Sequence, residues 1–403
     1  MDTSLNPRLA AVSPSPTARI MERARELKRA GQDIVDLAGG EPDMPPPEAA
    51  REAGIERIRS GNLSYGPIPG SLELRTAIAE RIARRQGVAC DAASIIVGTG
   101  SKQVLFEALF AATTPGDEVI IPSPHWVSYP AMVALAGGNA KIVATTSKTG
   151  FKLTPSQLAD ALSSRTRWLI LNSPSNPTGA VYRKSELAAL AEVIRSHPRI
   201  MVLSDDIYED ICYDGVEVTT IGALGSDLLE RSVSCSGFSK SFAMTGLRVG
   251  YARAPTWLRN SMMAVQSHVT NGGCVVAQSI AEGSLSAAPE FPSETCEIYA
   301  RRRARGLAIL AQTNQLEITP PDGAFYFWIG VESLLGSKSP QGHHLTLDSD
   351  LSAALLLEVG LAVMPGSAFG APGYLRMSFA AKDDAVAEGC IRLVKFAQDC
   401  RHG

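Results

Sequence analysis

The chain has 403 residues, of which 45% are apolar, 20% charged and 6% aromatic. Its 38 Lys and Arg residues are nearly balanced by 41 Asp and Glu residues, and the formal net charge is −3. Because this balance offers no broad cationic face, we expect no nucleic-acid partner. No apolar run approaches the ~20 residues that a membrane helix needs, so we also expect no membrane partner. The first twenty residues lack a charged head followed by an apolar run, so no secretory signal is predicted.

The seven cysteines are an odd number and are scattered along the chain without a CxxC pair. This usage argues against a disulfide framework and a zinc knuckle, and it favours a reduced, cytoplasmic compartment. The six histidines contain no HExxH motif. We therefore expect a cytoplasmic protein without a metal site.

Short apolar runs alternate with longer amphipathic segments over most of the chain. The stretch up to about Pro47 is Pro-rich and irregular, with one helical piece at residues 18–30. Strands are then predicted at residues 94–98, 118–121, 168–171 and 200–203, and helices at 102–112, 155–162 and 184–196. Alternation of this kind predicts right-handed crossovers and a mostly parallel sheet. Ligands of such sheets bind beyond the carboxyl ends of the strands.

The alternation of short strands and helices ends at residues 293–312, where a long, Arg-rich helical pattern begins. Two further strands are predicted after it, at residues 323–329 and 361–364. The basic triplet Arg301–Arg303 is typical of a solvated helix face. We predict three parts: an N-terminal arm with part of a small domain (1–47), a large central domain (48–292) and a small C-terminal domain (293–403).

A glycine-containing turn over residues 98–103 joins a predicted strand to a predicted helix. It has Gln103 where a dinucleotide fingerprint needs its third glycine, and it lacks the GxxxxGK[ST] spacing. Its backbone N–H groups could nevertheless converge on an anion at the helix N-terminus. An ordinary tight turn would also use these glycines.

Lys240 lies among small residues in the segment 236–250, and Arg248 follows eight positions later. A lysine amine forms a Schiff base with a carbonyl cofactor, and small neighbours let a planar ring approach. An arginine can grip a phosphate with two hydrogen bonds. The alternative is a surface lysine in a Ser/Gly loop, but three large apolar residues make this segment largely apolar.

The predicted strand at 200–203 runs into two carboxylates, Asp205 and Asp206. A carboxylate at this place could keep a pyridine nitrogen protonated, which makes the ring an electron sink. Helix capping by Ser204 or Asp205 is the alternative interpretation.

With these segments in view, the chain resembles a class I aminotransferase, a pyridoxal-phosphate enzyme of the aspartate aminotransferase family, from about Ser13 to Cys400. Residues 237–250 fit the cofactor-lysine signature of that family. Further blocks occur in the family's order and spacing: GGEPD (39–43), SPHWVSYP (123–130), NSPSNPTGA (172–180), SDDIY (204–208), PDGAFY (321–326), PGSAFG (365–370) and LRMSFA (375–380). The resemblance implies an α/β protein of fold type I, with a mostly parallel central sheet flanked by helices and a smaller α/β domain from both chain ends.

The resemblance also implies roles for individual residues. Lys240 would be the Schiff-base lysine and the catalytic acid–base. Asp205 would pair with the pyridine nitrogen, Tyr208 and Asn176 with the ring's phenolic oxygen, and Trp126 would stack on the ring. The phosphate group would be bound by Gly100, Ser101, Lys102, Ser239 and Arg248, and by Tyr65 from the neighbouring subunit of a homodimer. The substrate α-carboxylate would be bound by Arg376, with Asn176, Trp126 and the backbone of Gly40.

The predicted reaction is ping-pong transfer of an amino group between an L-amino acid and a 2-oxo acid. The expected substrates are aspartate or glutamate, with oxaloacetate or 2-oxoglutarate. The alternatives are an aromatic or unusual amino acid, a pyridoxal-phosphate-dependent lyase or cyclase, or a regulatory protein that keeps the fold without the chemistry.

Three departures from the family pattern concern the substrate side chain. Ser13-Pro14-Ser15 lacks a lysine that related bacterial enzymes often carry, Leu247 replaces a tryptophan, and residues 271–273 read Asn-Gly-Gly. Leu247 and Phe369 lend the surroundings a more apolar character. An acidic substrate needs a cation at its far end, and Arg19 or an arginine of the partner subunit is expected to supply it.

Overall fold

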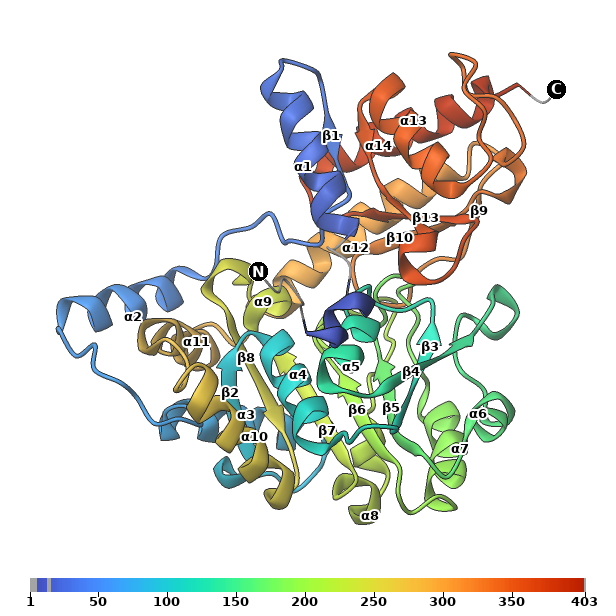
Figure 1. The fold of residues 1–403 in the computed structure, drawn as a ribbon. Helices are drawn as coiled ribbons and strands as arrows, with labels where there is room; N and C mark the ends of the chain where they lie inside the picture. Colours follow the sequence, from blue (N-terminus) through green and yellow to red (C-terminus); the bar gives the residue numbers. More distant parts are fainter. Residues whose placement is uncertain (1–5, 13–15, 402–403) are drawn as a thin grey trace, which may run out of the picture.

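The computed structural model describes residues 6–12 and 16–401. Its largest sheet has seven strands in the order β2-β8-β7-β6-β5-β3-β4 (Figure 1). Their bounds are β2 Ile95–Thr99, β3 Glu118–Ser123, β4 Asn139–Ala144, β5 Thr166–Asn172, β6 Met201–Asp205, β7 Ser232–Gly237 and β8 Val249–Arg253. The pairs β3–β4, β3–β5, β5–β6 and β6–β7 are parallel, whereas β8 runs antiparallel to both β2 and β7. The prediction of a mostly parallel sheet is therefore confirmed.

Helices cover both faces of this sheet, because successive strand residues point to opposite sides. One face packs against α4 Ser101–Ala112, α5 Tyr129–Ala136 and α10 Thr256–Val269. The other packs against α3 Leu72–Gln86, α6 Pro155–Ala161, α7 Lys184–Arg195 and α11 Val275–Ala287. Helix α2 Glu48–Arg59 lies against α11 (Figure 1). Burial on both faces explains why β2, β3, β5 and β6 read as short apolar runs in the sequence.

Three strands of this sheet were not predicted. Strand β4 lies at the edge of the sheet and is partly exposed. Strand β7 is built mainly from serine and glycine (SVSCSG), and β8 lies at the end of the segment that we interpreted as a motif. None of them shows the bulky apolar run on which the strand predictions depended.

A second layer is built from both ends of the chain (Figure 1). It contains α1 Pro16–Arg29, β1 Val35–Asp36, α12 Phe291–Leu310, α13 Asp348–Val359 and α14 Asp383–Asp399. Its four-stranded sheet has the order β12-β13-β10-β9, with β9 Glu317–Ile318, β10 Tyr326–Gly330, β12 Met364–Pro365 and β13 Tyr374–Ser378. The chain ends are joined because β1 pairs in parallel with β11 Leu361–Ala362.

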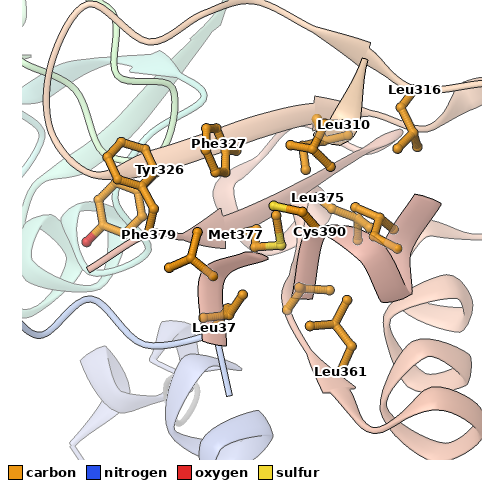
Figure 2. Close-up of a cluster of buried hydrophobic side chains, with 14 of the residues drawn as sticks. Leu37, Leu310, Leu316, Tyr326, Phe327, Leu361, Leu375, Met377, Phe379 and Cys390 are labelled. Atoms are coloured by element: carbon orange, nitrogen blue, oxygen red, sulfur yellow. The ribbon is translucent and has the colours of Figure 1, made fainter. Parts of the chain in front are cut away.

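Figure 2 shows the core of this second layer, in which Leu37 from the N-terminal part packs with Leu361, Met377 and Cys390 from the C-terminal part. The remaining short elements are α8 Ser226–Leu229, α9 Phe238–Ser241 and the 3-10 turns η1 Pro7–Ala11, η2 Ala92–Ser94, η3 Ser147–Thr149, η4 Ile221–Leu224, η5 Thr245–Leu247, η6 Glu332–Leu334 and η7 Gly366–Phe369. The domain limits at 47/48 and 292/293 stay a prediction. Across the ranges described, no helix is both long and apolar enough to span a membrane.

The interpretation of Arg301–Arg303 as a solvated helix face is wrong for two of the three residues. Arg302 is only 7% exposed and makes two hydrogen bonds to Asp43, at 2.7 and 2.9 Å. Arg303 is largely buried and its guanidinium lies 5.0 Å from the centre of the Tyr213 ring. Carboxylates and a ring that are distant in the sequence, Asp43, Asp383 and Tyr213, offset the cost of burying these cations, and a local pattern does not reveal them.

Candidate active site

Five strands of the large sheet end at the same edge, and each is followed by residues of one cavity. Strand β2 leads to Ser101, β3 to Trp126, β5 to Asn176, β7 to Lys240, and β6 ends at Asp205 itself. The cavity has a volume of about 270 Å³. Strands β10 and β13 of the second layer add Tyr326 and Arg376 to its wall. A mostly parallel sheet places its ligand site at this edge.

Lys240 lies on α9, directly after β7, and its Nζ donates a hydrogen bond to the carbonyl of Gly40 at 2.5 Å. Burial lowers the pKa of Lys240 to about 8, while the Glu41 carboxylate at the cavity wall opposes this shift. A substantial share of the amine is therefore neutral near pH 7.5. A neutral lysine is the form that attacks a carbonyl carbon.

Asp205 is a fully enclosed carboxylate at the end of β6. Burial raises its pKa to about 6, and hydrogen bonds from the Tyr129 hydroxyl and the Ile207 backbone oppose the rise. The Tyr129 hydroxyl lies 2.6 Å from Asp205 Oδ2. Because that pKa lies below 7, Asp205 can carry a negative charge opposite a protonated ring nitrogen at neutral pH.

Asn172, the last residue of β5, holds the backbone at two points of the cavity wall. Its Nδ2 donates to the carbonyl of Asp205 at 2.7 Å, and its Oδ1 accepts from the backbone N–H of Asn176 at 2.7 Å. The side-chain amide of Asn172 therefore fixes the backbone of Asp205 and of Asn176, two residues that are predicted to contact the cofactor.

The turn between β2 and α4 provides the N-terminus of a twelve-residue helix. Gly100 has φ +80°, and a Cβ added there would lie 2.5 Å from Nη2 of Arg248. The missing side chain thus leaves room for a guanidinium directly over the helix N-terminus. Backbone N–H groups and an arginine at such a place form an anion site that suits a phosphate group.

Arg376 is buried and lies between two aromatic rings, with its guanidinium carbon 4.4 Å from the centre of Tyr326 and 4.8 Å from that of Phe369. Its Nη1 donates to Asn176 Oδ1 at 2.9 Å and its Nη2 to the carbonyl of Ala38 at 2.5 Å. Its Nε has no hydrogen-bond partner among the described residues. A buried guanidinium held by neutral groups is suited to bind a carboxylate from outside the chain.

The structure brings most of the predicted site residues to this cavity. Nine of them line it: Gly40, Ser101, Lys102, Trp126, Asn176, Asp205, Tyr208, Lys240 and Arg376. Gly100 and Arg248 adjoin it at the helix N-terminus, and Ser239 is buried next to Lys240. Tyr65 does not line the cavity and is 90% exposed.

The residues expected to meet the substrate side chain are placed differently. Arg19 is exposed on α1 and does not line the cavity, and Leu247 and residues 271–273 do not line it either. Ser13 lies outside the described residues. Besides Lys240 and Arg376, the cavity wall has a third basic residue, Lys102, whose Nζ lies 4.8 Å from the centre of the Trp126 ring. Burial lowers the pKa of Lys102, and the charge of Arg248 lowers it further.

Sequence reasoning missed Tyr129, Tyr326 and Asn172 as cavity residues. All three lie inside motif blocks that match the family, at 123–130, 321–326 and 172–180, but no chemistry in those blocks distinguishes them from packing residues. The blocks were therefore the only signal that could have found them.

A lysine and a buried carboxylate on the wall of one cavity, a helix N-terminus with an arginine and a second, buried arginine together fit pyridoxal phosphate. On this fold they define a pyridoxal-phosphate-dependent enzyme of fold type I. Residues 32–393 match the family model for aminotransferase class I and II. The chain is 43% identical, over 97% of its length and 98% of the relative's, to an aspartate/prephenate aminotransferase of Cereibacter sphaeroides.

Solved structures agree with this assignment. The aspartate aminotransferase of Rhizobium meliloti superposes with a TM-score of 0.95 at 37% identity, covering 99% of this chain and 100% of that one. The Thermus thermophilus aspartate aminotransferase with maleate gives 0.90 at 36% identity, covering 98% and 100%. The chain belongs to the class I and II aminotransferase family: it is a transaminase that uses pyridoxal phosphate.

Proposed function

We propose that this cavity transfers the amino group between an acidic L-amino acid, aspartate or glutamate, and a 2-oxo acid. The observation that carries the proposal is the placement of Lys240, Asp205 and Arg376 around one cavity. When bound, pyridoxal phosphate supplies a carbonyl that condenses with amines and a ring that accepts electron density from the substrate Cα.

Each residue then has a defined task. Asp205 holds the proton on the ring nitrogen, and Tyr208 with Asn176 binds the phenolic oxygen. Arg376 binds the substrate α-carboxylate and thereby fixes the direction of the Cα–H bond. The Lys240 amine, whose pKa burial lowers to about 8, would accept the proton from the substrate Cα and would then be the acid that returns it.

The preference for an acidic substrate is supported by Lys102. Its ammonium lies at the cavity wall on the ring of Trp126, so a distal carboxylate would meet a positive charge there. The names of the relatives favour the same class, since one is an aspartate/prephenate aminotransferase and another was solved with maleate. Prephenate, a 2-oxo acid with a second carboxylate, therefore belongs among the acceptors to be tested.

A donor and acceptor panel tests this proposal. For the wild type we expect stoichiometric exchange of amino and oxo acid with aspartate or glutamate, and no activity for Lys240→Ala. Lys102→Met should lower kcat/KM for acidic donors by about fivefold, the equivalent of ~1 kcal/mol for one exposed ion pair, and spare neutral donors. Release of ammonia and a free oxo acid would indicate a lyase. If Lys102→Met lowers kcat/KM equally for acidic and neutral donors, Lys102 does not determine the substrate preference.

We further infer a homodimer in which Tyr65 completes the phosphate site of the partner. Tyr65 is exposed in the single chain, and large apolar side chains gather in the same stretch: Ile55, Ile58, Leu63 and Leu72 are exposed as well. A monomer would leave these side chains in water, whereas a two-fold contact would bury them.

Mixing two inactive variants tests the shared site. If Lys240→Ala and Tyr65→Ala subunits exchange, one of the two sites in a mixed dimer carries neither lesion, and activity returns in part. An active monomer in sedimentation would contradict the homodimer. We also propose a cytoplasmic location, which the seven free thiols support.

A further inference from the structure

Two tyrosine hydroxyls meet across the cleft between the two layers of the protein. Tyr208 follows β6 of the large sheet, and Tyr326 begins β10 of the smaller one. Their hydroxyl oxygens are 2.7 Å apart, and both side chains are buried. This is a direct polar link between the residue proposed to bind the phenolic oxygen and the layer that carries Arg376.

The space for this hydroxyl is provided by Gly40. A Cβ added to Gly40 would lie 2.3 Å from Tyr326 Oη, well inside van der Waals contact, and 3.3 Å from Cζ, which is a tight contact. The carbonyl of the same residue accepts the hydrogen bond of Lys240. The backbone at residue 40 therefore fits closely around the Tyr326 hydroxyl on one side and the reactive amine on the other.

The ring of Tyr326 has a separate contact. Its face lies under the guanidinium of Arg376 at 4.4 Å, and it packs against Phe325 at 5.0 Å between ring centres. Figure 2 shows Tyr326 at one end of the cluster of buried side chains that includes Phe327 and Phe379. The hydrophobic core thus fixes the ring, and the ring in turn limits where Arg376 can lie.

A tyrosine hydroxyl has one proton to donate and can also accept. If Tyr208 donates its proton to the phenolic oxygen, its own oxygen is left to accept from Tyr326. The hydroxyl of Tyr326 has no second polar partner among the described residues, so it is available to donate in this direction. The order of the hydrogen bonds is then Tyr326 to Tyr208 to the cofactor.

We propose that Tyr326 is a positioning residue with two separable functions: its hydroxyl orients Tyr208 toward the cofactor, and its ring holds Arg376 in place for the substrate carboxylate. This inference rests on the proposed roles of Tyr208 and Arg376. The two functions predict different kinetic and spectroscopic effects, because one acts on the cofactor and the other on the substrate.

The test compares Tyr326→Phe, Tyr326→Leu and the control Tyr299→Phe in the holoenzyme. Tyr299 is a buried tyrosine of the same core whose hydroxyl faces the sulfur of Met44. Two quantities are measured: the pH midpoint of the visible absorbance of the bound cofactor, and kcat and KM for the amino donor. The absorbance reports on the cofactor independently of turnover.

A hydrogen bond to the phenolic oxygen favours the form of the cofactor linkage that has lost its proton. Weakening that bond by removing the Tyr326 hydroxyl should therefore raise the midpoint, by about half a unit to one unit for a neutral hydrogen bond. In Tyr326→Phe the ring remains, so KM should stay within about twofold of the wild type, since the Arg376 contact is kept. Tyr326→Leu should in addition raise KM by about tenfold, because the cation–π contact is lost.

Two results would overturn the inference. The hydroxyl function is refuted if the midpoint in Tyr326→Phe matches that of the wild type and Tyr299→Phe. The ring function is refuted if Tyr326→Leu and Tyr326→Phe have the same KM. Should Tyr326→Phe not fold, Tyr326→Leu also lacks the hydroxyl, and it must raise the midpoint too. If the wild type shows no visible cofactor absorbance that Lys240→Ala abolishes, the proposed function itself fails. That outcome can be distinguished from the two results above, which compare variants that bind the cofactor.

Discussion

Replacing Tyr129 with phenylalanine removes one hydroxyl group from the site and keeps the ring in its place. The ring lies edge-on to Trp126, with centres 5.3 Å apart, so its packing is retained. What is lost is the 2.6 Å hydrogen bond to Asp205 Oδ2. The Asp205 carboxylate would then accept only one hydrogen bond that lowers its pKa, from the backbone N–H of Ile207 at 3.4 Å.

The size of the effect follows from the charge on Asp205. A hydrogen bond to an ionised group contributes about 1.5–3 kcal/mol, and one pKa unit corresponds to 1.36 kcal/mol, so the pKa of Asp205 should rise by about one to two units. It starts at about 6. The negative charge of Asp205, which is proposed to pair with the protonated ring nitrogen, would then be incomplete near pH 7.

The assay is titration of the apoenzyme with pyridoxal phosphate between pH 5.5 and 9, followed by visible absorbance. Binding should weaken as the pH falls through the pKa of Asp205, and in Tyr129→Phe the midpoint should move up by about one to two units. Well above that midpoint, both proteins should bind equally. Tyr182→Phe is the matched control, because that buried hydroxyl accepts a hydrogen bond from the Leu153 backbone instead. An unchanged midpoint in Tyr129→Phe would refute the reasoning.

Two further predictions concern residues close to the turn between β2 and α4. Burial raises the pKa of Glu107 from its ordinary 4.5 to about 7, so the folded protein holds this proton more tightly than the unfolded chain, and stability falls as pH rises through that window. Glu107→Gln should remove this dependence, worth at most about 3 kcal/mol, in denaturant midpoints measured from pH 4.5 to 8; equal slopes for both proteins would contradict it. Gly250→Ala would place a Cβ 2.1 Å from the backbone nitrogen of Ser101, whereas a Cβ on Gly246 meets nothing within 4 Å. Gly250→Ala should therefore weaken cofactor binding by about tenfold or more while Gly246→Ala does not, and the same affinity in both would show that the turn can shift.

Much of the large domain was predictable from the sequence because its signals are local. The strands β2, β3, β5 and β6 are short apolar runs, and each begins and ends within two residues of its predicted range. Strand β7 was missed because serine and glycine carry no such signal, although burial in the middle of the sheet makes it a strand all the same. Pairing with the neighbouring strands β6 and β8, rather than the residues of β7 themselves, determines that this segment is a strand.

The cofactor lysine could be located for the same reason, since Lys240 lies within a continuous segment of small and apolar residues. Its chemistry could not be predicted with equal detail. Burial lowers the pKa of Lys240, and the carbonyl that binds its amine belongs to Gly40, 200 residues earlier in the chain. The motif thus locates the lysine proposed to bind the cofactor, and its burial beside a distant loop sets its basicity.

The sequence by itself determined which residues of this protein have the chemistry of a pyridoxal-phosphate enzyme, and in what order they occur. Only the tertiary structure decided which of them touch: Tyr129 contacts Asp205 across 76 residues, Tyr208 contacts Tyr326 across 118, and Arg376 contacts Asn176 across 200. Local patterns are set by backbone propensity and periodicity, which act over a few residues. Hydrogen bonds between distant side chains form only after sheet topology and core packing have brought their strands to one edge, and neither is encoded in any single segment.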